Sequence, residues 1–291
     1  MLTTPLSLRL TRLASAPVEA QSGSTAQAPA EQVDTFTGAS VHAVKAKAKT
    51  KFKDNDWTKL SGTIMNREAV RGIGGEVPPA GSFLMLDKPI TLNGKKVTEV
   101  HLTDTFKKGL NVVLNGRLNA RKWGGVETKG GTYAELSGLS NLSKGEPAFN
   151  GKEFVDASGT KLQRLSYNRP LIMDAPAQIF VLDRKKGKAF IGAMGGFIPP
   201  WINSFHGFRA SAAIKSATAA DRAAVKEVGG RLVNAKSGKA LELIGTSGGG
   251  NFPDAMSTSW YMDAESKKLY AFLNGGIAGF QNHMSEVVKL P

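Results

Sequence analysis

The stretch KKGLNVVLNGRLNARKWGG, residues 107–125, predicts a long strand of a small β-barrel. Apolar side chains recur at every second position, at Leu110, Val112 and Leu114. A period of two places one set of side chains in a core and the set between them outside it. Gly116 interrupts the run, and a glycine inside a strand usually marks a bulge or the sharp bend of a barrel corner.

Cations gather at the end of this strand. Arg121 and Lys122 stand beside Trp123, and Arg117 lies four positions before Arg121. Cations interleaved with an aromatic side chain suit a surface that follows a phosphate backbone and stacks bases. The same residue types also fit a barrel strand whose outer face is merely basic, and on residue types alone that interpretation is the simpler one. Both interpretations stay open at this point.

Residues 57–142 contain four further stretches with strand character. They cover residues 57–65, 82–86, 97–102 and 132–139. Asn93-Gly94 is a hairpin signal, because glycine supplies the positive φ that a tight turn needs. Five short strands in a segment of this length are typical of an oligonucleotide- or oligosaccharide-binding (OB) barrel. We therefore expect an OB-like five-stranded barrel over residues 57–142.

The opening strand also resembles part of a known family. Lys108-Gly109, the run 112–118 and the cluster Arg121-Lys122-Trp123 are similar to the fourth-strand region of bacterial single-stranded-DNA-binding proteins. The resemblance implies an OB fold, oligomer formation, and aromatic and basic side chains that line a single strand. By position, the resemblance assigns the family's binding role to four residues of this chain, which are Arg117, Arg121, Lys122 and Trp123. The chain departs from the family in its first strand, in lacking an acidic C-terminal tail and in its large C-terminal half.

The C-terminal half, residues 150–291, contains an internal duplication. The segments 174–183 and 254–263 share an Asp-Ala start, an apolar run and a closing Asp, and they lie eighty positions apart. Self-similarity at a fixed period indicates one supersecondary unit used twice. Each copy predicts two hairpins, with Asp, Asn, Ser and Gly in the turns. We expect an eight-stranded β sandwich or barrel, whose copies cover about 150–198 and 230–291.

A connector over residues 199–229 joins the two copies. It contains one predicted helix, opened by a capping box at Thr218 and Asp221 and stopped at Gly229-Gly230.

Residues 1–56 have the composition of a disordered basic arm or linker. The segment is rich in Ala, Ser, Gln and Pro and ends in an alternating Lys run, so it cannot bury enough apolar surface to order itself. It has no apolar run of the length that a signal peptide or a membrane helix needs. Because an export address need not be hydrophobic, a cytoplasmic location and export by an atypical route both stay open.

The overall charge favours anionic partners. The chain of 291 residues has a net charge of +14 and no cysteine. Such a charge suits nucleic acid, acidic lipid or acidic polysaccharide. The cations are spread over the whole chain, which weakens any assignment of the charge to one domain. The absence of Cys excludes disulfides, thiolate metal sites and a cysteine nucleophile, and we predict no cofactor.

Three residues are candidates for catalysis. Asp174 and Asp254 are equivalent in the duplication, and two carboxylates that meet on a pseudo-twofold axis share a proton and perform acid–base chemistry. The simpler expectation is that each is a turn or bulge residue at the start of a strand. His206, with Ser204 or Ser211, suggests a hydrolase, but the chain has no Gly-x-Ser-x-Gly elbow. None of the four histidines has metal-ligand spacing to another.

These observations favour a non-enzymatic binding protein whose barrel engages single-stranded nucleic acid or another extended polyanion. Candidate ligand-binding residues are Trp123, Tyr133 and Phe83 for stacking, and Arg117, Arg121 and Lys122 for phosphate contacts. The first alternative is an exported structural or host-interaction protein that binds protein or glycan through its β domains. The second is a hydrolase with its site in the C-terminal domain. None of these patterns predicts the oligomeric state.

Overall fold

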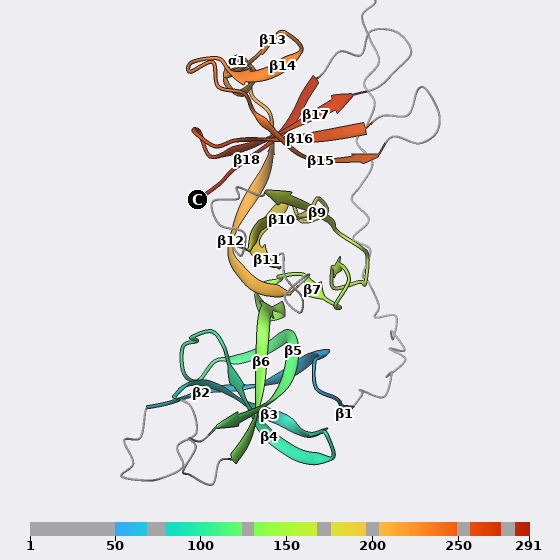
Figure 1. Cartoon of the computed structure of the whole chain (residues 1–291), viewed down its shortest axis with the longest axis vertical. Helices are drawn as coiled ribbons and strands as arrows, with labels where there is room; N and C mark the ends of the chain where they lie inside the picture. Colours follow the sequence, from blue (N-terminus) through green and yellow to red (C-terminus); the bar gives the residue numbers. More distant parts are fainter. Residues whose placement is uncertain are drawn as a thin grey trace, which may run out of the picture. The chain divides into compact units, whose positions relative to one another are not determined.

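The computed structural model describes residues 50–68, 80–123, 131–167, 176–195, 204–248, 257–274 and 283–291. Residues 48–291 form one compact unit. The described residues are mostly in strands, with a single α-helix of five residues, as the sequence predicts (Figure 1). Residues 1–49 of the predicted arm lie outside the described residues.

Five strands close into a small barrel. They are β2 (Asp56–Arg67), β3 (Gly81–Leu92), β4 (Lys95–Leu102), β5 (Asn111–Trp123) and β6 (Gly131–Asn141). Hydrogen-bonded pairs run round the ring in the order β2-β3-β4-β6-β5 and back to β2. Of these five pairs only β4–β6 is parallel. The predicted five-stranded barrel is therefore present (Figure 1).

Alternating apolar residues of these strands fill the barrel interior. The fully buried ones are Ile64, Leu84, Val100, Leu114, Leu118 and Leu136. Gly116 lies where the register between β5 and β6 shifts, between Asn115 and Arg117. A Cβ at Gly116 would lie 2.8 Å from Cγ of Leu136. The two strands therefore approach closely at a glycine, which is the irregularity that the opening stretch predicts.

The barrel begins earlier in the chain than the predicted boundary at residue 57. The short strand β1 (Lys51–Phe52) pairs in parallel with β3. Phe52 is buried in the barrel core, which accounts for the order of this segment. The last residues of the predicted arm thus belong to the barrel.

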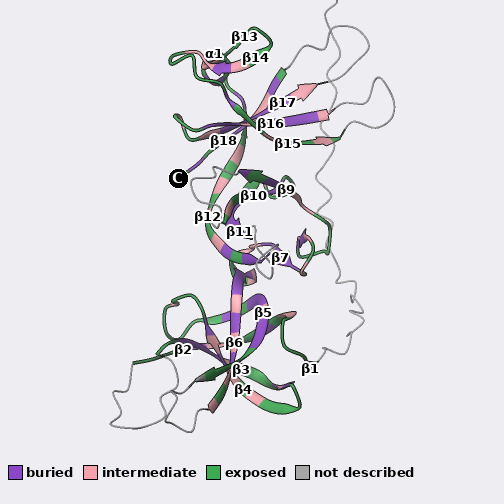
Figure 2. Cartoon of the chain, viewed as in Figure 1, coloured by how far each residue is buried: buried purple, intermediate pink, exposed green. Residues whose placement is uncertain are grey.

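A second sheet of eight antiparallel strands follows, in the order β15-β16-β17-β18-β12-β11-β10-β9. Its strands are β9 (Gln163–Tyr167), β10 (Ala177–Asp183), β11 (Lys188–Met194), β12 (Phe205–Ser216), β15 (Glu242–Gly248), β16 (Ser257–Asp263), β17 (Lys268–Asn274) and β18 (His283–Lys289). The edge strands β9 and β15 approach each other, since a Cβ at Gly245 would lie 2.8 Å from Leu165. The sheet is therefore nearly closed around a buried cluster that includes Phe180, Trp260 and Leu269. Figure 2 colours the buried parts of the chain purple.

The duplication is visible in the strands themselves. The bounds of β10 and β16 lie eighty positions apart, and so do those of β11 and β17. The register shifts at equivalent places, between Ile191 and Gly192 in β11 and between Ala271 and Phe272 in β17. The two copies therefore share their irregularities as well as their strands.

Each copy also begins with a small covering unit. In the first copy it consists of η1 (Leu142–Lys144), β7 (Ala148–Phe149) and β8 (Phe154–Val155). In the second it consists of α1 (Ala219–Ala223), β13 (Val225–Val228) and β14 (Arg231–Asn234). Phe149 and Phe154 pack on the outer face of β10 and β11, while Val225 and Leu232 pack on β17 and β18.

One long strand, β12, belongs to both copies. From Phe205 to Ala213 it pairs with β11, and from Ile214 to Ser216 it pairs with β18. The end of β6 lies against the start of β12, because Gly207 of β12 lies against the backbone of Leu139. The fourth strand of the first copy, β12, therefore lies next to the last barrel strand, β6. The fourth strand of the second copy, β18, lies in the same way next to β12.

The connector differs from its prediction. Residues 205–216 form β12, which is the fourth sheet strand of the first copy. The four strands of this copy in the sheet are therefore β9 to β12, and β8 lies outside the eight-stranded sheet. The capping box is present, with Thr218 Oγ1 accepting from the Asp221 amide and Asp221 accepting from the Thr218 amide. The helix ends at Ala223, and Gly229-Gly230 instead forms the turn between β13 and β14. Val225 and Val228 favour this hairpin, because β-branched residues suit strands.

Candidate polyanion-binding surface

Two of the predicted cations, Arg117 and Arg121, lie on the outer face of β5, since they are out of phase with the buried Leu118, and Arg121 is ion-paired. The Nε of Arg121 donates a 2.8 Å hydrogen bond to Oε1 of Glu135 on β6. This hydrogen bond, more than any other interaction, raises the pKa of the Arg121 guanidinium. The side chain of Arg121 is 48% exposed, so it can reach a ligand, but its charge is largely compensated.

Phe83 is not an open stacking surface. Its residue is only 2% exposed. The guanidinium of Arg67 lies over the ring, 4.3 Å from the centroid, and the His101 ring contacts it edge-on at 5.1 Å. Arg67 in turn donates two hydrogen bonds to the carboxylate of Glu99. The ring is therefore covered by its own neighbours, so a base would have to displace the Arg67–Glu99 pair to stack on it.

Tyr133 stands beside this group. It is half-buried, and its ring packs edge-on against His101 at 5.7 Å. Burial, and to a lesser extent the charge of Glu135, raises the pKa of the Tyr133 hydroxyl. In the β5–β6 register Tyr133 is directly opposite Arg121. The structure thus brings Tyr133, Arg121 and Phe83 into one band that runs through His101.

Arg117 and Trp123 do not join this band through any described contact. The positive charge of Arg117 acts on His206 of β12, at the other end of β5. Trp123 is the last residue of β5 and pairs with Gly131, and its side chain lies outside the described residues.

Uncompensated cations gather instead at one end of the barrel. We call Lys51, Lys53, Lys95, Lys96 and Lys122 the barrel-end lysines, and all five are exposed. None of them forms an ion pair with a carboxylate of the described residues. Lys122 is the only one of the five among the predicted ligand residues.

Strand pairing brings four of these lysines together. Thr91 of β3 is paired with Lys51 on one side and with Lys96 on the other. The Nζ of Lys95 donates to Oγ1 of Thr132 at 3.5 Å, and Thr132 is directly opposite Lys122. Each of these threonines therefore has two lysines beside it. Because neighbouring strands lie about 4.8 Å apart, the two lysines of each pair stand close enough to contact neighbouring phosphates.

Two carboxylates near the barrel-end lysines are occupied by backbone amides. Oδ1 of Asp54 accepts from the Ala120 amide at 2.7 Å, and Oδ2 of Asp56 accepts from the Lys53 amide at 3.0 Å. The Asp54 hydrogen bond ties the chain before β2 to β5, and the Asp56 hydrogen bond is local, within the turn that leads into β2. Five lysines stand against these two carboxylates, so the region has an excess of positive charge.

The catalytic candidates gain no support. Asp174 and Asp254 both lie outside the described residues. His206 is on β12, and burial, Arg117 and Arg209 lower the pKa of its imidazole. No serine hydroxyl of the described residues is hydrogen-bonded to it, and Ser204 is buried. The described residues also contain no group of three or more His, Asp or Glu side chains suited to a metal ion.

The sequence contained a signal for the barrel-end lysines. Lys51 and Lys53 end the alternating basic run, and Lys95-Lys96 follow the Asn93-Gly94 turn. What the sequence did not show is that a short parallel strand and a hairpin place these two pairs at the same end of the barrel as Lys122.

No protein-family model, curated protein or solved structure matches the chain. Within the described residues, no helix has the length and apolar character that crossing a membrane requires.

Proposed function

We propose that the protein is a non-enzymatic binding protein whose barrel engages an extended polyanion, with single-stranded nucleic acid as the preferred ligand. The observation that carries this proposal is the group of five exposed barrel-end lysines without carboxylate partners in the described residues. Cations fixed along the end of a barrel suit a flexible chain of phosphates, because each neutralised phosphate releases condensed counterions.

The architecture supports the same proposal. A closed five-stranded barrel in which the third and fifth strands pair in parallel is the arrangement we expect of an OB barrel. Barrels of this type bind oligonucleotides or oligosaccharides with their strand faces and the loops beside them. Tyr133 and Arg121 are opposite each other on β6 and β5, and Lys122 and Thr132 form the next pair towards the end of the barrel, with their side chains on the other face of the two strands.

The test is the salt dependence of binding to a labelled single-stranded oligothymidylate of about 16 nucleotides, near the upper site size of one OB fold. If all five lysines contact phosphates, the slope of log K against log salt is roughly −3.5, from about −0.7 for each phosphate neutralised on a single strand. Replacing Lys95 and Lys122 by Gln should make the slope less steep by about 1.4.

Two exposed lysines away from the barrel, Lys152 and Lys236, provide the matched control, because replacing both by Gln removes the same charge. Fluorescence anisotropy measures each complex between low and high salt. An affinity that does not change with salt, or an equal loss in the control variant, rejects the proposal. Binding to a glycan array with no binding to the oligonucleotide would favour the protein- or glycan-binding alternative.

A further inference from the structure

The carboxylate of Glu135 lies between a permanent cation and a histidine. Its Oε1 accepts the 2.8 Å hydrogen bond from Nε of Arg121. Its Oε2 lies 4.0 Å from Nδ1 of His101 on β4, which is directly opposite Glu135 in the β4–β6 register. An arginine keeps its charge at every physiological pH, whereas the charge of a histidine changes between about pH 5 and 8. Only one of the two partners of Glu135 therefore responds to pH.

The His101 ring is held in place by its neighbours. Its side chain is 14% exposed, and its ring contacts those of Phe83 and Tyr133 edge-on. On the far side of the imidazole, Nε2 lies 3.2 Å from the carbonyl oxygen of Ala80. Because a carbonyl only accepts, this partner assigns the hydrogen of the neutral ring to Nε2 and leaves Nδ1 without one. Nδ1 is therefore the atom at which the ring gains a proton.

The neutral form leaves Nδ1 of His101 unsatisfied. The atom is buried and has no hydrogen-bond partner among the described residues. A bare ring nitrogen and the carboxylate of Glu135 that faces it are both acceptors, so they cannot bond to each other. A proton at Nδ1 turns the same contact into a charge-assisted N–H···O interaction. The geometry thus favours the protonated ring at this carboxylate.

The other charged or titratable groups around the ring are Arg67 of β2, Glu99 of β4, Arg121 of β5 and Tyr133 of β6. Arg67 donates two hydrogen bonds to Glu99, so the charges of these two groups cancel. Tyr133 stays neutral in this pH range, since burial raises the pKa of its hydroxyl. Arg121 and a protonated His101 therefore share one carboxylate, that of Glu135.

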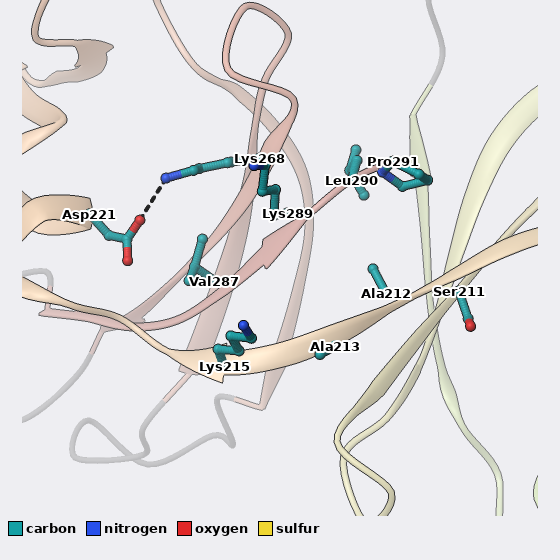
Figure 3. A pocket seen from close by; sticks show the side chains of 10 residues that line it. All are labelled: Ser211, Ala212, Ala213, Lys215, Asp221, Lys268, Val287, Lys289, Leu290 and Pro291. Carbon is teal, nitrogen blue, oxygen red and sulfur yellow. Dashed lines mark hydrogen bonds and ion pairs between the residues drawn. The ribbon is translucent and has the colours of Figure 1, made fainter.

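A second pair of cation and carboxylate shows what the histidine adds (Figure 3). Nζ of Lys268 donates a 2.7 Å hydrogen bond to Asp221, drawn as the dashed line. This bond and one from Thr218 hold the pKa of the Asp221 carboxyl at about 2, and no histidine of the described residues is among the groups that act on the pair. Its charge is therefore constant between about pH 5 and 8, whereas the Arg121–Glu135 pair has a titrating neighbour.

We propose that His101 makes polyanion binding by the barrel dependent on pH, because its protonation engages Glu135 and leaves the charge of Arg121 available to a phosphate. The inference rests on the proposed function, in which Arg121 is a candidate phosphate contact. With a neutral ring, the charges of Arg121 and Glu135 cancel. With a protonated ring, two cations share one carboxylate, so the group has a net positive charge and attracts a polyanion more strongly.

The position of the group on the barrel supports this coupling. Phe83 of β3 and His101 of β4 are directly opposite each other, and these are the second and third strands of the barrel. OB barrels bind oligonucleotides with the face of these two strands. A proton gained at His101 would therefore act on the face where the ligand is expected.

The test measures binding of the labelled oligothymidylate to the full chain at about pH 8 and about pH 5.5, on either side of the ordinary pKa of a histidine. The label is a dye whose emission does not change over this range. Wild-type binding should be about threefold tighter at the lower pH. The slope of log K against log salt should also become steeper by about 0.7, the value for one further neutralised phosphate.

His101→Gln should bind with the same affinity and salt slope at both pH values, because an amide gains no proton in this range. His206→Gln and His283→Gln are the matched controls, since both residues are exposed histidines of the second sheet, and both should keep the wild-type pH dependence. Glu135→Gln tests the same coupling with the histidine intact. Its salt slope should be the steeper one at both pH values, because the charge of Arg121 is then uncompensated throughout. Circular dichroism at both pH values confirms that each variant is folded.

Three results would overturn the inference and leave the proposed function standing. The first is wild-type binding that is the same at both pH values. The second is a pH dependence in His101→Gln equal to that of the wild type. The third is a pH dependence that is lost in a control variant instead. Absence of binding at both pH values would reject the proposed function, and the inference with it.

Discussion

Gly187 and Lys267 occupy equivalent turn positions, eighty residues apart, and both have a left-handed backbone, with φ of 60° and 51°. Glycine adopts this conformation freely, whereas a residue with a Cβ is disfavoured there by about 1 kcal/mol or more. The turn between β16 and β17 thus carries strain that its counterpart between β10 and β11 avoids.

Replacing Lys267 by Gly should therefore stabilise the protein by about 0.5 to 1 kcal/mol, because relief of the strain exceeds the added entropy of the unfolded chain. Gly187→Ala is the reciprocal change and should destabilise by about 1 kcal/mol. Urea denaturation measures both. A lower stability of Lys267→Gly would show that the Lys267 side chain has a compensating role.

Asp221→Ala should destabilise the protein by about 1 to 2 kcal/mol at pH 7, because it removes the capping box and the partner of Lys268. The folded-state pKa of Asp221, about 2, lies below the ordinary value of 3.8. The carboxylate therefore contributes stability above about pH 4, and this contribution is lost as the pH falls towards 2.

The measurement is the free energy of unfolding of both proteins from pH 7 down to pH 3. The difference in the free energy of unfolding between wild type and Asp221→Ala should become smaller below about pH 4. A gap that stays constant over this range would mean that the ionised carboxylate contributes nothing.

Gly116→Ala should destabilise the barrel by about 1 to 3 kcal/mol, because the added methyl group overpacks the β5–β6 contact. Its Cβ would lie 2.8 Å from Cγ of Leu136 and 3.0 Å from Cδ2 of Leu139. Val113→Ala, an exposed change on the same strand, is the control and should alter stability by less than about 1 kcal/mol. Thermal unfolding compares the two, and an unaltered Tm for Gly116→Ala would contradict the close approach.

Trp57→Ala should weaken the coupling between the barrel and the second sheet. The indole packs edge-on against Phe149 at 4.7 Å and lies 6.4 Å from Phe205 of β12. Loss of such a side chain costs about 3 kcal/mol or more. We expect calorimetry to show one unfolding transition in the wild type and two in the variant. A single transition at a lower Tm would mean that other contacts suffice for coupling.

Glu135→Gln should strengthen oligothymidylate binding under the proposed function. The carboxylate of Glu135 now accepts from Arg121, and replacing it by a neutral amide would leave the charge of the guanidinium uncompensated and available to a phosphate. The salt slope should become steeper by about 0.7, the value for one further phosphate contact. Weaker binding would show that Glu135 holds Arg121 in its binding position.

Local patterns predicted the barrel and the duplication well. Alternating apolar residues around Leu114 and the glycine at 116 are properties of one strand, and so they can be recognised from neighbouring positions alone. The turn acids Asp183 and Asp263 also behave as expected, because Oδ1 of each accepts from amides of the following turn.

The surface could not be predicted in the same way. Whether Arg121 is free depends on Glu135, fourteen positions later, and whether Phe83 is open depends on Arg67 and Glu99. These pairings follow from strand register, which a single strand does not reveal. For the same reason β12 was missed, because its alternation of exposed and half-buried residues depends on partners in both copies.

The double membership of β12 has a consequence for synthesis on the ribosome. Its first part completes the sheet of the first copy, and its last part is a template on which β18 pairs. Since domains fold from the N-terminus as the chain emerges, the barrel can support the first copy and the first copy can then support the second. Circular permutation that places the second copy before the barrel would reverse this sequence of events and should slow folding without removing a single contact within either copy.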